Sequence, residues 1–200
     1  MRFSVSIIVL LILLAVSGKS LIAELFYQQS LFGTGERNVK HGLLLASKLR
    51  PLDSRYQIAI GQYYRANKLY HESLKHYQKA LKLSPAKPQI WAGYIHALIL
   101  VNEKGQILAD AIEQATRLGP AERNMYLGLS ILALKYWYQL EPVARQKFYR
   151  IIKETSTNNP HELQQSIASY RQREVYCRIF SIDIQAKRWC SNKQLPFSEK

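Results

Sequence analysis

Apolar residues recur at helical spacing through the middle of the chain. In residues 70–83, four of them would share one face of a helix: Leu74, Tyr77, Ala80 and Leu81. Pro85 follows shortly afterwards, where a proline ends a helix. Residues 56–66 form a second helical stretch, which ends at the polar pair Asn67-Lys68. The pattern therefore predicts a hairpin of two helices within residues 54–87.

The same features return at a nearly fixed interval. An alanine followed five residues later by a proline occurs three times, as Ala46 with Pro51, Ala80 with Pro85, and Ala115 with Pro120. The steps between them are 34 and 35 residues. Helical hairpins that repeat at this period stack on one another, because a single hairpin cannot bury its apolar face alone. The pattern therefore predicts an all-α chain of stacked hairpins.

Residues 54–87 resemble the tetratricopeptide repeat (TPR) family. The residues that match the family's spacing are Gly61, Tyr64, Ser73, Tyr77, Ala80 and Pro85. Gln57 departs from the family, which has a large aromatic residue there, and Trp91 restores that aromatic in the next unit. The resemblance implies a TPR-like right-handed solenoid of helical hairpins. Its expected units are residues 20–53, 54–87, 88–122 and a divergent 123–155.

Beyond residue 122 the pattern weakens but stays helical. The expected elements are a helix over residues 124–138, a helix from Pro142 to about residue 153, a polar break over residues 155–160 and a helix over residues 161–180. Residues 156–190 are expected to cap the open end of the solenoid. The apolar residues expected to face inward there are Leu163, Ile167, Tyr170 and Val175. Residues 191–200 are expected to be a flexible tail.

The N-terminus begins with Arg2 and a charge-free stretch over residues 3–18. A cationic start before an apolar run is typical of a signal peptide or a short membrane anchor, and residues 1–19 are predicted to be one of these. Ser17 ends a small-residue cleavage site, whereas the apolar pattern beyond Lys19 favours an uncleaved anchor. Because Arg2 resists translocation, we expect a bacterial inner-membrane protein, single-pass with its domain facing the periplasm. If the segment is cleaved, we expect a periplasmic protein.

The chain is strongly basic. It carries 28 Lys and Arg against 14 Asp and Glu, a formal net charge of +14. This balance favours anionic partners, and an exported protein would not meet nucleic acid. The expected partners are an envelope protein with an acidic or extended segment, the inner membrane through the N-terminal helix, and anionic glycan or lipid headgroups. One basic run could contact anionic glycan or lipid headgroups, or it could be a solvated face. It includes Arg145, Lys147, Arg150 and Lys153.

The residues that could carry chemistry are few. Cys177 and Cys190 are the two cysteines. In an oxidising compartment they could form a disulfide that closes a loop of about 14 residues, worth about 3 kcal/mol, or they could be two idle thiols. Neither the cysteines nor the histidines show the spacing of a metal site. No nucleophile lies near an obvious base in sequence. The expectation is a protein that is not an enzyme, without metal or cofactor.

The TPR resemblance also implies where a partner would bind. In that family the first helix of each unit lines a concave face. On this chain that gives a candidate groove formed by Arg55, Gln62, Arg65, Gln89, His96, Asn124 and Lys135. The family's chaperone-binding members hold a peptide carboxylate with a Lys and Asn pair, and here Glu24 and Gln28 occupy those places. The groove is therefore expected to take an acidic or extended segment rather than a chaperone tail.

A second resemblance concerns the whole layout. A short N-terminal apolar segment, a few TPR-like units and the stretch from Leu134 to Arg145 are similar to the VpsP-like group, small bacterial envelope proteins associated with exopolysaccharide biosynthesis. The function that this implies is a non-enzymatic TPR scaffold supporting surface-polysaccharide biosynthesis. The alternative is a general periplasmic TPR adaptor for another envelope machine, such as secretion, cytochrome assembly or cell-wall synthesis. A lectin-like module that binds acidic glycan directly is a third class, and it would need exposed aromatic residues on the groove.

Overall fold

The structure of the protein is a computed structural model that describes residues 17–31, 36–103, 105–120, 122–167 and 170–191. Every regular element in these ranges is a helix, so the predicted all-α class is confirmed. The chain divides into two compact units, Met1–Asn102 and Glu103–Lys200, and each is described by itself. The expected tail, residues 191–200, lies outside the described residues except for Ser191.

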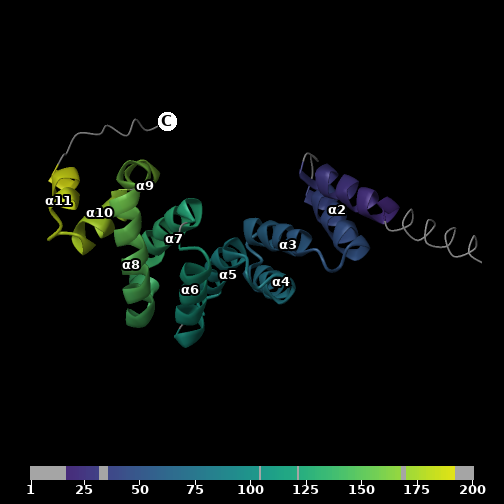
Figure 1. The fold of residues 1–200 in the computed structure, drawn as a ribbon, viewed down its shortest axis with the longest axis horizontal. Coiled ribbons are helices and arrows are strands. Elements are labelled where there is room, and N and C mark those ends of the chain that lie inside the picture. Colours follow the sequence, from purple (N-terminus) through teal and green to yellow (C-terminus); the bar gives the residue numbers. More distant parts are fainter. Residues whose placement is uncertain (1–16, 32–35, 104, 121, 168–169, 192–200) are drawn as a thin grey trace, which may run out of the picture. The chain divides into compact units, whose positions relative to one another are not determined.

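The helices of the first unit follow one another in short hairpins (Figure 1). They are residues 17–31, α2 (Glu36–Leu49), α3 (Ser54–Ala66), α4 (Tyr70–Leu83) and α5 (Pro88–Leu100). The second unit contains α6 (Gln106–Leu118), α7 (Arg123–Tyr136), the short 3-10 helix η1 (Trp137–Gln139), α8 (Pro142–Asn158), α9 (Pro160–Ser166), α10 (Tyr170–Ile179) and α11 (Ile184–Ser191).

The recurring alanines and prolines have the same structural place each time. Helices α2, α4 and α6 each end two residues before the proline, at Leu49, Leu83 and Leu118. The three alanines, Ala46, Ala80 and Ala115, are all fully buried. The periodicity therefore predicts correctly where these three helices end, because the alanine marks a buried position and the proline follows the end of the helix.

Tyr77 is the centre of the packing between α3, α4 and α5. Its side chain is 1% exposed and belongs to a buried apolar cluster with Ala80, Ile90 and Ala97. A Cβ placed on Gly61 of α3 would lie 3.1 Å from the Tyr77 ring, so the ring packs directly against that helix backbone. Ser73 of α4 adds a hydrogen bond from its hydroxyl to the Gly61 carbonyl at 2.8 Å. The close crossing of α3 and α4 therefore depends on a glycine, a buried serine and one large aromatic ring.

The N-terminal helix, residues 17–31, packs closely against α2. A Cβ placed on Gly42 would lie 2.7 Å from the Phe26 carbonyl oxygen, so only a glycine allows this approach. Ala23 and Ala46 are fully buried together with Tyr56 of α3, and the rings of Tyr27 and Tyr56 meet edge to face at 5.5 Å. Residues 17–31 therefore belong to the folded first unit.

The expectation of a single-pass inner-membrane protein is corrected. In the part of the chain that the structure describes, no helix combines the length and the apolar character needed to cross a bilayer. The described helix over residues 17–31 carries Lys19 and Glu24 and buries Ala23 in the domain core. Residues 1–16 of the predicted anchor lie outside the described residues. They include Ala15 and Val16 of the candidate cleavage site.

The second unit departs from the expected boundaries at two places. The predicted polar break over residues 155–160 is wrong, because α8 continues to Asn158. Thr155 is 1% exposed, and its hydroxyl bonds the Ile151 carbonyl at 2.8 Å and the Ser130 hydroxyl of α7 at 2.9 Å. A polar residue that finds partners in this way can lie inside a packed helix. The break comes at Asn159, one residue before Pro160.

The single helix expected over residues 161–180 is also wrong. Two helices, α9 and α10, occupy this segment, and α9 ends at Ser166. Leu163, Ile167 and Val175 are buried as expected, whereas the Tyr170 side chain lies outside what the structure describes. The additional helix α11 follows, with Cys190 near its end.

Candidate functional site

Cys177 of α10 and Cys190 of α11 form a disulfide bond. Two further contacts hold the same pair of helices together: the Tyr176 and Trp189 rings meet edge to face at 5.5 Å, and the Arg173 guanidinium lies 4.8 Å over the Trp189 ring. The two cysteines therefore have a structural role in joining α10 to α11. No group of three or more metal-ligating side chains gathers in the described residues.

The candidate groove residues fall on both units. Arg55, Gln62 and Arg65 lie on α3, and Gln89 and His96 lie on α5, a helix that contacts α3. Asn124 and Lys135 are exposed on α7 of the second unit. The Lys135 ammonium lies 5.3 Å over the ring of the adjacent Tyr136. The first unit alone therefore supplies five of the seven predicted residues.

Arg55 forms ion pairs with two carboxylates of the chain itself. Its Nη2 atom lies 2.9 Å from Asp53 Oδ2 and 3.6 Å from Glu24 Oε2. Asp53 also caps α3 by accepting the Arg55 backbone N–H at 3.0 Å. Burial alone would raise the pKa of Asp53, but the hydrogen bonds from Arg55 outweigh it and lower that pKa overall. Arg55 therefore belongs to the cap of α3, and its charge is neutralised there.

Arg65 and His96 lie next to each other. The Arg65 Nη1 atom is 2.7 Å from His96 Nδ1, and both side chains are partly buried. A guanidinium can only donate, so His96 Nδ1 accepts and the imidazole is neutral with its proton on Nε2. Among the described residues, no carboxylate lies within ion-pair distance of Arg65. In the described part of the chain, Arg65 is therefore a fixed cation that forms no ion pair with a carboxylate.

We call Gln62, Arg65, Gln89 and His96 the α3–α5 face. Gln62 and Gln89 are exposed. Gln62 lies one helical turn before Arg65 on α3, and Gln89 lies two turns before His96 on α5. The face thus presents one guanidinium held by an imidazole, with an exposed amide on either helix. Such donors suit a carboxylate or the backbone of an extended chain.

A half-buried histidine on α4, His76, packs against α3, and sequence reasoning did not single it out. The His76 ring stacks on Tyr64 with centroids 5.3 Å apart, and its Nδ1 lies 2.9 Å from Gln57 Oε1. An amide oxygen accepts, so His76 Nδ1 donates. Burial, followed by the charge of Lys79, lowers the pKa of His76 to about 4. Gln57, which departs from the TPR pattern, is therefore the hydrogen-bond partner of a neutral histidine.

The stability of the protein should fall when the pH is lowered from about 6.5 to about 4. The unfolded chain protonates His76 near its ordinary pKa of 6.5, whereas the folded chain does so only near 4. The folded state therefore loses free energy relative to the unfolded state across this window, on the order of 2 kcal/mol after allowance for solvent screening. Urea unfolding at pH 7 and pH 4.5 measures the difference.

The matched control is His41→Gln, since His41 is exposed on α2. That variant should keep the full pH dependence, whereas His76→Gln should lose most of it between pH 6.5 and pH 4.5. An undiminished pH dependence in His76→Gln would show that another group is responsible.

The basic run of the second unit is partly used for internal contacts. Arg145 donates to the Trp137 carbonyl at 3.0 Å and to the Tyr138 carbonyl at 3.2 Å. Lys147 pairs with Glu113 of α6. Arg150 and Lys153 are exposed. The run therefore ties η1 and α6 to α8 as well as contributing positive charge to the surface.

Comparison with known proteins identifies no matching family model and no matching curated protein. The arguments about function therefore rest on the residues and contacts of this chain.

Proposed function

We propose that the protein is a non-enzymatic scaffold, built as a TPR-like right-handed solenoid, that binds an acidic or extended segment of a protein partner. The observation that carries this proposal is that His96 holds the partly buried Arg65 guanidinium, which forms no ion pair with a carboxylate of the described residues. Holding a guanidinium in a fixed orientation reduces the entropy that binding would otherwise cost, and this favours a functional role for the pair.

The position of the pair supports the same proposal. It lies on α3 and α5, which the TPR resemblance takes as the first helices of two successive units, and TPR-like proteins hold extended segments on those helices. The exposed amides of Gln62 and Gln89 would bond the backbone of such a segment, and Arg65 would bond a carboxylate. Arg55 takes no part in this proposal, since Asp53 and Glu24 already occupy it.

The setting that the second resemblance implies is exopolysaccharide biosynthesis, and we propose it on that resemblance alone. The stretch from Leu134 to Arg145 that carries it forms the corner between α7 and α8. Leu134, Leu140 and Ala144 are buried there, so packing accounts for much of its pattern. An adaptor for another assembly, such as secretion or cell-wall synthesis, would use the α3–α5 face in the same way.

A photocrosslinking residue placed at Gln62 should capture the partner in the native host. Gln62 is exposed on α3, so a substitution there should leave the fold intact. The matched control is the same photocrosslinker at Lys79, which is exposed on α4. Mass spectrometry should map the Gln62 crosslink to an acidic or extended segment. Equal crosslinking to the same protein from both positions would contradict the proposed face.

A further inference from the structure

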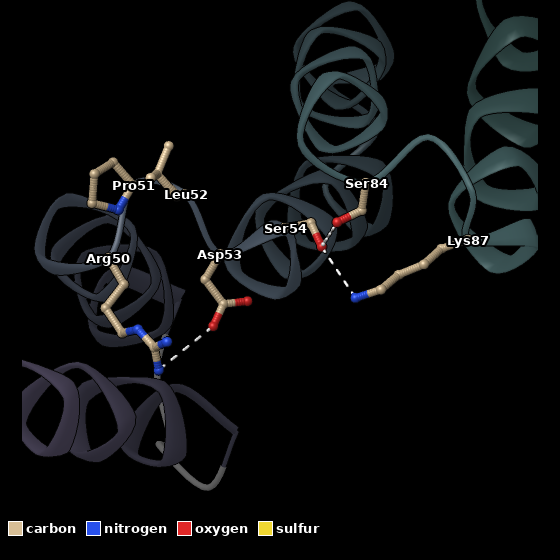
Figure 2. Close-up of a pocket in the computed structure, with 7 residues that line it drawn as sticks. All are labelled: Arg50, Pro51, Leu52, Asp53, Ser54, Ser84 and Lys87. Atoms are coloured by element: carbon tan, nitrogen blue, oxygen red, sulfur yellow. Dashed lines mark hydrogen bonds and ion pairs between the residues drawn. The ribbon is translucent and has the colours of Figure 1, made fainter.

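The first unit contains a pocket of about 400 Å³ where the α2–α3 loop meets the α4–α5 loop. Figure 2 shows its polar lining, which comes from both loops and from the first residue of α3: Arg50, Asp53, Ser54, Ser84 and Lys87. The volume falls within the roughly 300–1,000 Å³ of small-molecule sites. None of these residues belongs to the α3–α5 face, so the pocket is a separate feature of the unit.

A buried hydroxyl lies at the centre of this lining. Ser54 is 2% exposed, and its Oγ accepts hydrogen bonds from the Ser84 hydroxyl at 3.0 Å and from Lys87 Nζ at 3.5 Å, the upper limit for such a bond. With its oxygen accepting two donors, the Ser54 hydroxyl still has a hydrogen to donate. The structure gives that hydrogen no acceptor among the described residues. An acceptor in the pocket would complete the bonding of Ser54.

The charges around the pocket leave an excess of one positive charge. Asp53 is the only carboxylate in the lining, and Arg55 holds it at 2.9 Å while Arg50 lies 3.8 Å away. Arg55 also reaches Glu24. Three cations, Arg50, Arg55 and Lys87, thus face two carboxylates. In the described part of the chain, Lys87 lies within ion-pair distance of neither.

We propose that this pocket binds a phosphate group, either as free phosphate or as the monoester of a small molecule. Lys87 supplies a mobile cation, Arg50 supplies a guanidinium, and Ser54 supplies a hydroxyl hydrogen from the buried side. Donors that arrive from two loops and from the pocket floor suit the several oxygens of a tetrahedral anion better than the two oxygens of a carboxylate. The remaining volume accommodates the organic part of a monoester.

Calorimetric titration of the purified protein tests this site by measuring its affinity for three probes: inorganic phosphate, phenyl phosphate and acetate. All titrations use the same ionic strength. Both phosphate probes should bind, and acetate should bind more weakly than either. Replacing the exposed Lys87 by Gln should weaken phosphate binding about tenfold, since a hydrogen bond to a charged group is lost. The matched control, Lys82→Gln on the exposed surface of α4, should bind phosphate as the wild type does.

The two phosphate probes separate the sources of the ligand. Tighter binding of phenyl phosphate supports a monoester, and tighter binding of inorganic phosphate supports the free anion. Arg50→Gln provides a second variant that should also weaken binding, because Arg50 lies on the opposite wall of the pocket from Lys87. The proposal is overturned if the wild type binds neither phosphate probe, if acetate binds equally well, or if Lys87→Gln and Arg50→Gln bind phosphate like the wild type.

Discussion

Replacing Gly93 by Ala should destabilise the protein by about 3 kcal/mol, the upper part of the range for overpacked cores. A Cβ on Gly93 would lie 2.6 Å from Tyr77 Cζ and closer still to Tyr77 Cε1. The ring cannot move away easily, because its other side already packs against Gly61. Tyr77 is thus held between two helix backbones, and an added methyl group would force α4 and α5 apart. Urea unfolding monitored by circular dichroism measures the loss.

Two other glycines give a graded control for this prediction. Gly61→Ala should cost less than Gly93→Ala, because its Cβ would lie 3.1 Å from the Tyr77 ring, a distance that a small shift can relieve. Gly128→Ala on α7 should stabilise the protein by about 0.5–1 kcal/mol, since nothing lies within 4 Å of that Cβ and alanine favours the helix. If all three variants have the same stability, the packing of Tyr77 between Gly61 and Gly93 is wrong.

The ends of the helices could be predicted from the sequence because local signals determine them. The predicted second helix of the 54–87 hairpin, residues 70–83, coincides with α4. Pro85 and the apolar spacing suffice for that, since both act within a turn or two of the helix end. The beginning of α3 was predicted two residues late, because Asp53 caps the helix and Ser54 is its first residue.

The errors in the second unit come from tertiary partners that the local pattern does not contain. The run over residues 155–158 is polar and therefore favoured a loop. In the fold, Thr155 bonds Ser130, and the Ser156 hydroxyl lies 2.5 Å from the Tyr176 hydroxyl. These partners are 25 and 20 residues away, so the sequence alone could not show that this polar run continues the helix.

The candidate site was predictable only in outline. The helical spacing of Arg55, Gln62 and Arg65 places them on α3, and the structure agrees. The spacing does not reveal that Glu24, from the N-terminal helix, forms an ion pair with Arg55. Nor does it reveal that His96 accepts a hydrogen bond from Arg65. The importance of Gly93 was missed for the same reason, since it depends on where the Tyr77 ring of another helix lies.

Reversing the charge of Arg65 should weaken partner capture by at least about tenfold, because it replaces the cation of the α3–α5 face by an anion that repels an acidic segment. The Arg65→Glu variant also loses the hydrogen bond to His96, so we expect a stability cost of about 1 kcal/mol. Arg65→Gln removes the charge but keeps an N–H donor for His96, and it separates the two effects. Its capture should be intermediate, with nearly wild-type stability.

Quantitative pull-down from the native host, at low and at high salt, tests the proposed function most directly. The baits are the wild type, Arg65→Glu and the charge-matched control Lys79→Glu on α4, each with its melting temperature measured. We predict a partner that the wild type and Lys79→Glu retain, that Arg65→Glu loses while still folded, and whose capture by the wild type fades at high salt. Equal retention of every partner by Arg65→Glu and the wild type would contradict binding at the α3–α5 face.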